Sequence, residues 1–247
     1  MKLLLVCATI AAASLNPTAS WAETDKWSGP YVGASADAVF DDTTIEDMGC
    51  WTSCSSISLR KASASATVSA GYDVQVTDDL VMGIVADFGS GNERRTLVGD
   101  GLPVSTTGTI THSSKIAERM SLRGRAGVTF GNSLIYLSGG IARAKVTHRV
   151  QGEGVPSYSP SHSADFDATW SGYNNGLIYG IGVERKIGAL SAKVEVVSTH
   201  YATKAACFSN STGSDIGQCW PTHYVIPPQV NFNSTSAQIR VGVNWRF

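Results

Sequence analysis

The sequence predicts an all-β fold, an eight-stranded antiparallel up-and-down barrel that spans a membrane. Three observations predict it. Apolar and polar residues alternate over long stretches, as they do in strands with two different faces. Short turns and long, mostly polar segments follow these stretches in strict alternation. The chain ends with Val-Gly-Val-Asn-Trp-Arg-Phe, a strand that stops on an aromatic residue.

The last strand, from about residue 232 to residue 247, carries apolar side chains on one face and polar side chains on the other. These sets are Ile239, Val241, Val243, Trp245 and Phe247 against Gln238, Arg240, Asn244 and Arg246. The aromatic pair Trp245 and Phe247 at the terminus looks like the assembly signal of bacterial outer-membrane barrels. The apolar face is therefore expected to meet lipid and the polar face to look inward.

The same alternation predicts seven further strands, at about 27–40, 61–76, 80–88, 119–130, 134–146, 177–184 and 190–196. Short turns are expected at 77–79, 131–133 and 186–189, and long loops at 41–60, 89–117, 147–170 and 199–230. In outer-membrane barrels the short turns are periplasmic and the long loops extracellular. A soluble β-sandwich also accommodates eight strands, but loops of this length are unusual inside a compact domain.

The strand at 134–146 leaves its facing open. Placing Ile135, Leu137 and Ile141 outward also sends Arg143 and Lys145 outward. A cation on the lipid face costs roughly 2–4 kcal/mol at the midplane but only about 0–1 kcal/mol near the interfaces. This penalty weakly favours the opposite facing, in which the outward residues are Tyr136, Ala142, Ala144 and Val146.

The first 22 residues predict a cleaved secretory signal peptide. Lys2 precedes an apolar run at 3–13, and Ser-Trp-Ala ending at Ala22 fits a small-x-small cleavage site. Residues 23–247 are then the barrel domain. The net charge of −1 gives no support to a nucleic-acid partner. No later stretch reaches ~18 consecutive apolar residues, which excludes a helical membrane protein.

Four cysteines follow the signal peptide: Cys50, Cys54, Cys207 and Cys219. An even number in an exported chain predicts disulfides. Three connectivities are open, and the pairs Cys50–Cys54 and Cys207–Cys219 are favoured because each lies within one predicted loop. A zinc site is disfavoured, since His223 alone does not complete a recognisable ligand spacing.

Charged residues gather on the predicted inward face. Counting from the short turns at about 2.3 Å of height per residue places Asp87, Arg123, Glu195 and Arg240 near mid-height, and Arg125 shares their inward face. Eight strands enclose an interior just wide enough for side chains to fill. Unpaired charge in so narrow a lumen would be very costly. These residues are therefore predicted to pair and plug the lumen, and a narrow, gated ion path is the alternative.

A catalytic or cofactor site finds little support in the sequence. Ser198 and His200 share a strand face, but Glu195 points to the other, so a contiguous hydrolytic triad is not expected. The acidic residues at 41–47 lack the spacing of an EF-hand, and scattered loop histidines do not predict haem binding. We expect no enzyme, metal or cofactor, with a lipid A-modifying enzyme as the weakest alternative.

Three segments together resemble the small porin-like outer-membrane proteins of α-proteobacteria, the family of the 25- and 31-kilodalton surface antigens. They are W-S-G-P-Y-V-G-A-S-A at 27–36, S-L-R-G-R-A-G-V-T-F-G-N-S-L-I-Y-L-S-G-G-I-A at 121–142, and the terminal V-G-V-N-W-R-F. The resemblance implies a monomeric barrel in the Gram-negative outer membrane, but it says little of activity. The expected partners are outer-membrane lipid and lipopolysaccharide, the barrel-assembly machinery, and an extracellular ligand or host surface reached by the loops.

Overall fold

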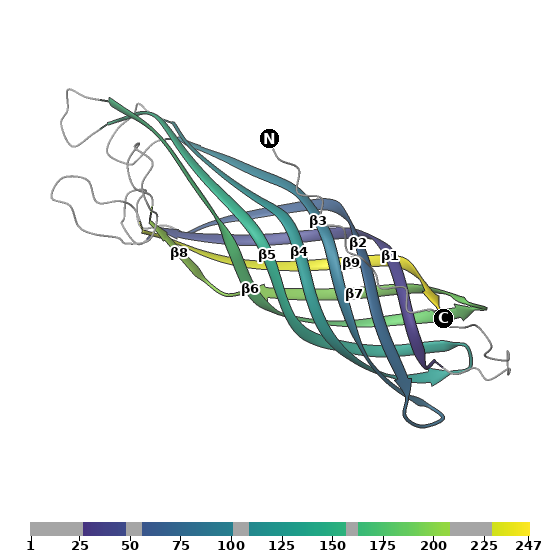
Figure 1. Ribbon diagram of the computed structural model, residues 1–247. Coiled ribbons are helices and arrows are strands. Elements are labelled where there is room, and N and C mark those ends of the chain that lie inside the picture. The colour runs from purple at the N-terminus through teal and green to yellow at the C-terminus, as the bar shows by residue number, and fades with distance from the viewer. Residues whose placement is uncertain (1–26, 48–55, 101–108, 157–162, 208–228) are drawn as a thin grey trace, which may run out of the picture.

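The computed structural model describes residues 27–47, 56–100, 109–156, 163–207 and 229–247. Within these ranges, nine strands form one antiparallel sheet that closes on itself (Figure 1). They are β1 (Gly29–Asp47), β2 (Ser56–Gln75), β3 (Leu80–Asp100), β4 (Thr109–Phe130), β5 (Ser133–Pro156), β6 (Ser163–Ile187), β7 (Leu190–Tyr201), β8 (Lys204–Cys207) and β9 (Gln229–Arg246). Pairing of β1 with β9 joins the two edges of the sheet into a barrel.

The nine strands make an eight-stranded barrel, because β7 and β8 together occupy one position in the wall. Both β7 and β8 pair with β9, first up to His200 opposite Thr235 and then again from Lys204 opposite Phe232. A short interruption at 202–203 therefore divides one stave into two strands. The predicted eight-stranded antiparallel up-and-down barrel is confirmed.

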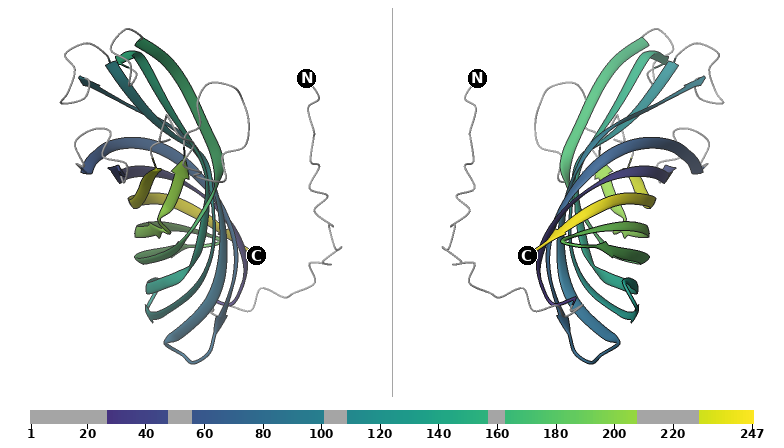
Figure 2. Two further views of the ribbon diagram at one scale, coloured as in Figure 1. Left: turned by 90° about the vertical axis from the view of Figure 1, so that its left-hand side faces the viewer. Right: turned by 90° about the vertical axis from the view of Figure 1, so that its right-hand side faces the viewer.

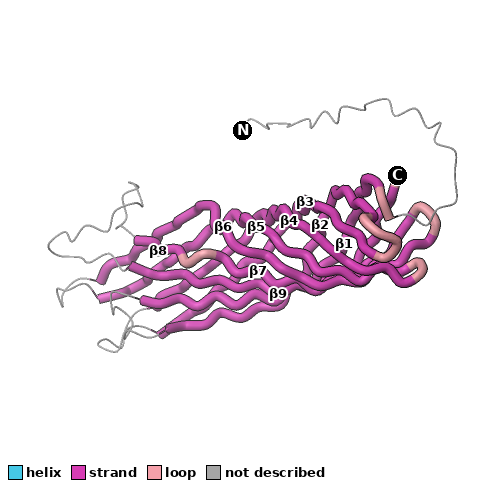
Figure 3. Tube along the Cα trace, turned by 90° about the horizontal axis from the view of Figure 1, so that it is seen from below, coloured by secondary structure: helices cyan, strands magenta, loops and turns pink. Residues whose placement is uncertain are grey.

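Three short turns lie at one end of the barrel, which we call the turn end, and we call the opposite end the open end (Figure 3). The turns join β2 to β3, β4 to β5 and β6 to β7, as predicted. Gly131 and Gly188 have positive φ angles of 56° and 67° in the last two turns. This left-handed conformation is the one that tight hairpin turns require.

The strands extend far beyond the predicted lengths toward the open end. Much of the ranges 41–60, 89–117 and 147–170, expected as loops, is strand instead; β3 and β4, for example, stay paired as far as Asp100 opposite Thr109. The prediction failed because it relied on alternating hydropathy. Where water reaches both faces of a strand, backbone hydrogen bonds maintain the pairing without any need for alternation.

Strand pairing is continuous around the barrel at the turn end but is interrupted at two places toward the open end. Pairing of β2 with β3 stops at Ala66 opposite Ser90, and pairing of β6 with β7 begins only at Gly176 opposite Tyr201. As a result, β3–β6 diverge from β1, β2 and β9 toward the open end (Figure 2).

Large apolar side chains cover the outside of the closed part. They form a belt, which we call the apolar belt, that includes Leu137 at 64% exposure, Leu177 at 66% and Val241 at 58%. The inside carries polar and charged side chains, so the usual distribution of a water-soluble protein is inverted. Such a large exposed apolar surface requires an apolar surrounding. No helix in the described ranges is long and apolar enough to cross a bilayer.

The weakly favoured facing of the strand at 134–146 is wrong. Tyr136 and Ala144 are buried inside the barrel, whereas Leu137 and Ile141 face outward together with Arg143. The long apolar side chains gain more free energy by facing outward than an outward Arg143 costs. That cost is small because Arg143 lies where the apolar belt ends. Its guanidinium Cζ is 4.2 Å from the centre of the Tyr173 ring.

The C-terminal strand has the predicted facing. Trp245 and Phe247 lie on the outer surface at the turn end, with ring centres 6.1 Å apart in a stacked arrangement. Arg246 and Asn244 point into the barrel. The predicted signal peptide lies outside the described part, and so do Cys50, Cys54, Cys219 and the side chain of Cys207. The cleavage site and the disulfides therefore stay predictions.

Candidate functional site

The lumen contains a balanced set of buried charges, which we call the lumen charges. Alternation along each strand turns every second side chain inward. Among the inward side chains of the described ranges, those that are charged and buried are six carboxylates and six cations: Asp37, Asp41, Asp73, Asp87, Glu184 and Glu195 with Arg119, Arg123, Arg125, Lys193, Arg240 and Arg246. Equal numbers of opposite charges allow the interior to be neutral while every side chain stays ionised.

Four of the predicted lumen residues meet in one group, which we call the central network. Arg123 on β4 donates from Nη1 and Nη2 to the two carboxylate oxygens of Glu195 on β7, at 2.6 and 3.2 Å. Its Nη2 is also 2.9 Å from Oδ2 of Asp87 on β3. Arg240 on β9 adds longer contacts, 3.4 Å to Asp87 and 3.8 Å to Glu195. The network therefore crosses the lumen between strands on opposite sides of the barrel.

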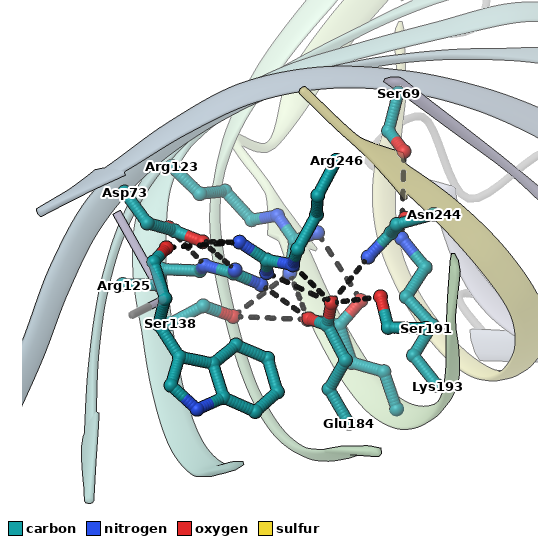
Figure 4. Close-up of polar contacts among 12 residues, drawn as sticks. Ser69, Asp73, Arg123, Arg125, Ser138, Glu184, Ser191, Lys193, Asn244 and Arg246 are labelled. Carbon is teal, nitrogen blue, oxygen red and sulfur yellow. Dashed lines mark hydrogen bonds and ion pairs between the residues drawn. The ribbon is translucent and has the colours of Figure 1, made fainter. Parts of the chain in front are cut away.

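The fifth predicted residue, Arg125, belongs to a second group nearer the turn end, the turn-end network. Arg125 pairs with Asp73 on β2 and, at 3.0 Å, with Glu184 on β6. Arg246 contacts the same two carboxylates, each at 2.8 Å. Figure 4 shows the two guanidinium groups between the two acids. Asn244 donates a further hydrogen bond of 3.0 Å to Glu184.

Two tyrosines hold the Arg125 guanidinium from either side. Its Cζ is 4.7 Å from the ring centre of Tyr31 and 5.0 Å from that of Tyr136, distances at which a cation is attracted by an aromatic face. Each tyrosine lies opposite a glycine in the strand register, Tyr31 opposite Gly71 and Tyr136 opposite Gly182. A Cβ on Gly182 would come within 2.5 Å of the Tyr136 ring. The glycines thus make the space in which the rings lie.

Trp27 covers the lumen at the turn end. Its ring is almost fully buried, with the Arg246 Cζ at 4.7 Å and the Lys186 Nζ at 5.5 Å from ring centres. The Trp27 backbone N–H donates to Oε1 of Gln75 at 3.0 Å, and its carbonyl oxygen accepts from Arg246 at 3.1 Å. These bonds fix the residue across the opening. Both the turn-end network and Trp27 therefore lie across the lumen between the central network and the turn end.

The open-end side of the lumen contains an ion pair and a hollow. Arg119 and Asp41 form an ion pair of 2.9 Å there. Between this pair and the central network is a hollow whose walls include Arg119, Tyr201, Gln238 and Arg240. Lys193 lies on the other side of the central network, where its Nζ is 3.4 Å from Oγ of Ser69 (Figure 4).

Glu195, Ser198 and His200 do not converge into a hydrolytic triad in the described part of β7. Glu195 is buried in the lumen, whereas His200 is on the outer surface, where its Nε2 is 2.8 Å from the Tyr179 hydroxyl. The two residues lie on opposite faces of β7, as strand parity predicts. In the described part of the chain no group of three or more His, Cys, Asp or Glu residues could hold a metal ion.

The sequence predicted one cluster of five lumen charges; four of them meet in the central network, whereas Arg125 belongs to the turn-end network, whose other members were missed. Asp73 and Arg246 were visible as inward residues, yet they come from opposite ends of the chain, and their meeting depends on the closure of β1 on β9. The Tyr–Gly pairs were also missed. A tyrosine and a glycine at inward positions of neighbouring strands are the signal that could have found them.

An apolar outside, an ionic inside and a closed eight-stranded sheet define the architecture of an outer-membrane β-barrel. No family model matches the chain, and no curated protein matches its sequence. The resemblance to the α-proteobacterial antigens therefore stays a prediction.

Solved structures of similar fold include three bacterial proteins of the outer membrane or cell surface. The outer membrane protease OmpT of Escherichia coli has a TM-score of 0.47 and 9% identity over 89% of this chain and 97% of that one. The outer membrane protein OprG of Pseudomonas aeruginosa has a TM-score of 0.43 and 11% identity over 89% and 96%. Neisserial surface protein A has a TM-score of 0.40 and 14% identity over 89% and 98%. At these identities the likeness concerns the fold alone.

Proposed function

We propose that this protein is a monomeric, structural and surface-interaction barrel of the Gram-negative outer membrane. The closed part of the barrel anchors it in the bilayer, the turn end faces the periplasm, and the open end contacts a ligand or host surface. The observation that carries the proposal is the central network. Arg123 joins Asp87 and Glu195 across the lumen, where a conducting path would have to run.

Physical cost argues against a path through these groups. A solute that crosses must displace the Arg123–Glu195 pair, whose side chains are each 1% exposed. Separating a buried pair leaves two charges without their partners, and each loss is worth several kcal/mol. The turn-end network and Trp27 would then have to open as well. An eight-stranded interior offers little room for such rearrangement, because side chains fill it.

The open end supports a surface role. On β5, thirteen residues separate Arg143, where the apolar belt ends, from Pro156 at the end of the strand. At a rise of ~3.3 Å per residue and a tilt of ~45°, the strand would reach about 30 Å beyond the belt. Its partners β4 and β6 accompany it, and so does β3, which pairs with β4 (Figure 1). This paired sheet offers a rigid support for recognition by the segments that connect the strands.

A narrow channel is the second candidate, favoured by the hollow between Arg119 and the central network. Ion flux in proteoliposomes tests the two functions against each other. Vesicles loaded with a potassium-sensitive dye and containing refolded protein should respond to external KCl no faster than protein-free vesicles. A flux that rises in proportion to the amount of inserted barrel would contradict the closed lumen and support the channel.

A further inference from the structure

Four cations lie on the outer surface of β4 and β5 at the open-end side of the apolar belt. We call Lys115, Arg143, Lys145 and Arg149 the basic patch. Arg143, Lys145 and Arg149 lie two, four and eight residues after Ile141 on β5, so they share its outward face, with Thr147 between the last two. Lys115 on β4 is opposite Thr147 in the register, between Lys145 and Arg149. The four side chains therefore occupy one continuous area of the outer wall.

The height of the patch coincides with the edge of the bilayer core. On β5 and β6, ten residues separate the pair Ser133–Arg185 at the turn end from the pair Arg143–Asn175. At ~3.3 Å per residue and a tilt of ~45° this is about 23 Å, close to the ~25 Å apolar band of outer-membrane barrels. Between these levels the outward residues include Leu137, Ile141 and Leu177, all strongly exposed. Arg143 is thus the first cation above the band.

Tyr173 organises the lower part of the patch. It is opposite Lys145 in the register, and its ring lies 4.2 Å from the Arg143 Cζ. Stacking on the ring orients the guanidinium while leaving its N–H groups available to donate. Successive outward positions on a strand are about 6.6 Å apart, within the reach of two long side chains toward one anion. A planar guanidinium beside an ammonium suits a phosphate group.

The opposite side of the barrel has a different outer rim. There Arg60 on β2 forms an exposed ion pair of 2.9 Å with Asp42 on β1. That arginine is paired with Asp42. Among the outward side chains that the structure describes on β4 and β5, the four cations of the basic patch accompany one acid, Glu118, opposite Lys145. The excess of positive charge is thus concentrated on β4 and β5, at a level where the headgroups of lipid molecules lie.

We infer that the basic patch binds the phosphate groups of a phosphorylated lipid of the outer leaflet, whose acyl chains lie against the apolar belt beneath it. Charge complementarity and the height of Arg143 both point to this occupant. The inference rests on the proposed membrane placement of the barrel, but it does not depend on whether the lumen conducts. It assigns a lipid site to one side of the outer wall.

Native mass spectrometry of the full-length protein in detergent tests the inference, with lipid A carrying two phosphates as the probe. Wild-type protein should retain this lipid and release it as NaCl is raised, whereas phosphatidylethanolamine should not compete. The double variant Arg143→Ala/Lys145→Ala should bind about 30-fold more weakly, since each basic residue near an anionic lipid surface contributes on the order of fivefold. Arg60→Ala is the matched control and should bind as wild type does.

Three results would overturn the site. Equal binding of lipid A and its phosphate-free form would show that the site does not recognise the phosphate groups. An equal loss in Arg60→Ala would make the effect one of total charge. Displacement by an equal concentration of inorganic phosphate would show a free-anion site instead of a lipid site. Heat-modifiable migration in SDS gels confirms that each variant is folded, and failure of the wild type to insert into vesicles would contradict the membrane placement separately.

Discussion

The Arg123–Glu195 pair offers a double-mutant test of the charge balance in the lumen. Glu195→Leu leaves the buried Arg123 guanidinium with Asp87 and Ser138, and Arg123→Met leaves the Glu195 carboxylate with the more distant Arg240. Each single change also gives the lumen a net charge. The double variant removes both charges, and Asp87 still keeps Arg240 at 3.4 Å and Ser121 at 2.7 Å.

The expected magnitudes differ between these variants. Removing one member of a buried pair costs about 3–5 kcal/mol of the free energy of unfolding, because it leaves a charge uncompensated. Replacing both members by apolar side chains of similar size should cost roughly 1 kcal/mol or less, since that exchange is often neutral. The coupling energy between the two positions should then be at least about 5 kcal/mol, because two separate losses are replaced by one small one.

Urea unfolding of the refolded barrel in detergent, followed by tryptophan fluorescence, measures these free energies. The exposed pair Arg60–Asp42, with side chains 82% and 39% exposed, provides the control cycle. Its coupling should be about 0–1 kcal/mol, as for other surface ion pairs. If the losses at Arg123 and Glu195 simply add in the double variant, the two residues do not depend on each other and the reasoning fails.

Three further changes have defined outcomes. Gly182→Ala should destabilise the barrel by about 1–3 kcal/mol through overpacking against Tyr136. The control Gly139→Ala should change the urea midpoint little, because its new Cβ would meet nothing closer than 3.9 Å. Equal midpoints for the two variants would argue against the Tyr–Gly contact. Deleting Phe247 should lower the fraction of heat-modifiable barrel in outer-membrane preparations, and an unchanged fraction would remove its role as an assembly signal. Deleting residues 208–228 should abolish surface binding to host cells while the barrel still assembles; retained binding would place recognition elsewhere.

Alternation of hydropathy predicted the fold because a membrane-embedded strand must present one face to lipid. It predicted the facing of Val241 and Trp245, and counting from the turns placed Asp87 and Glu195 at one height, where Arg123 joins them. Alternating hydropathy does not predict the parts of the strands that extend beyond the bilayer. There both faces of a strand meet water, and the paired extensions of β3–β6 resemble polar loops in sequence.

The remaining misses have other physical causes. The facing of β5 was undecided because the cost of an outward Arg143 depends on its height and on Tyr173, which belongs to another strand. The turn-end network depends on barrel closure, which brings Arg246 to Asp73 across a separation of 173 residues. Which residues meet over such a distance depends on the register between neighbouring strands. The sequence of a single strand does not reveal that register. The predicted disulfides and the signal peptide stay predictions.

Single-channel recording tests the central claim, a lumen closed by paired charges, most directly. Refolded wild-type protein is compared in planar bilayers with a variant in which Asp87, Arg123, Glu195 and Arg240 are all alanine, a change that removes the central network and keeps the charge balance. The wild type should insert without discrete current steps. The variant still has the turn-end network and Trp27 across the lumen, so it should show reproducible steps only when Trp27, Asp73, Arg125, Glu184 and Arg246 are replaced by alanine as well. Discrete steps from the wild type would contradict the account.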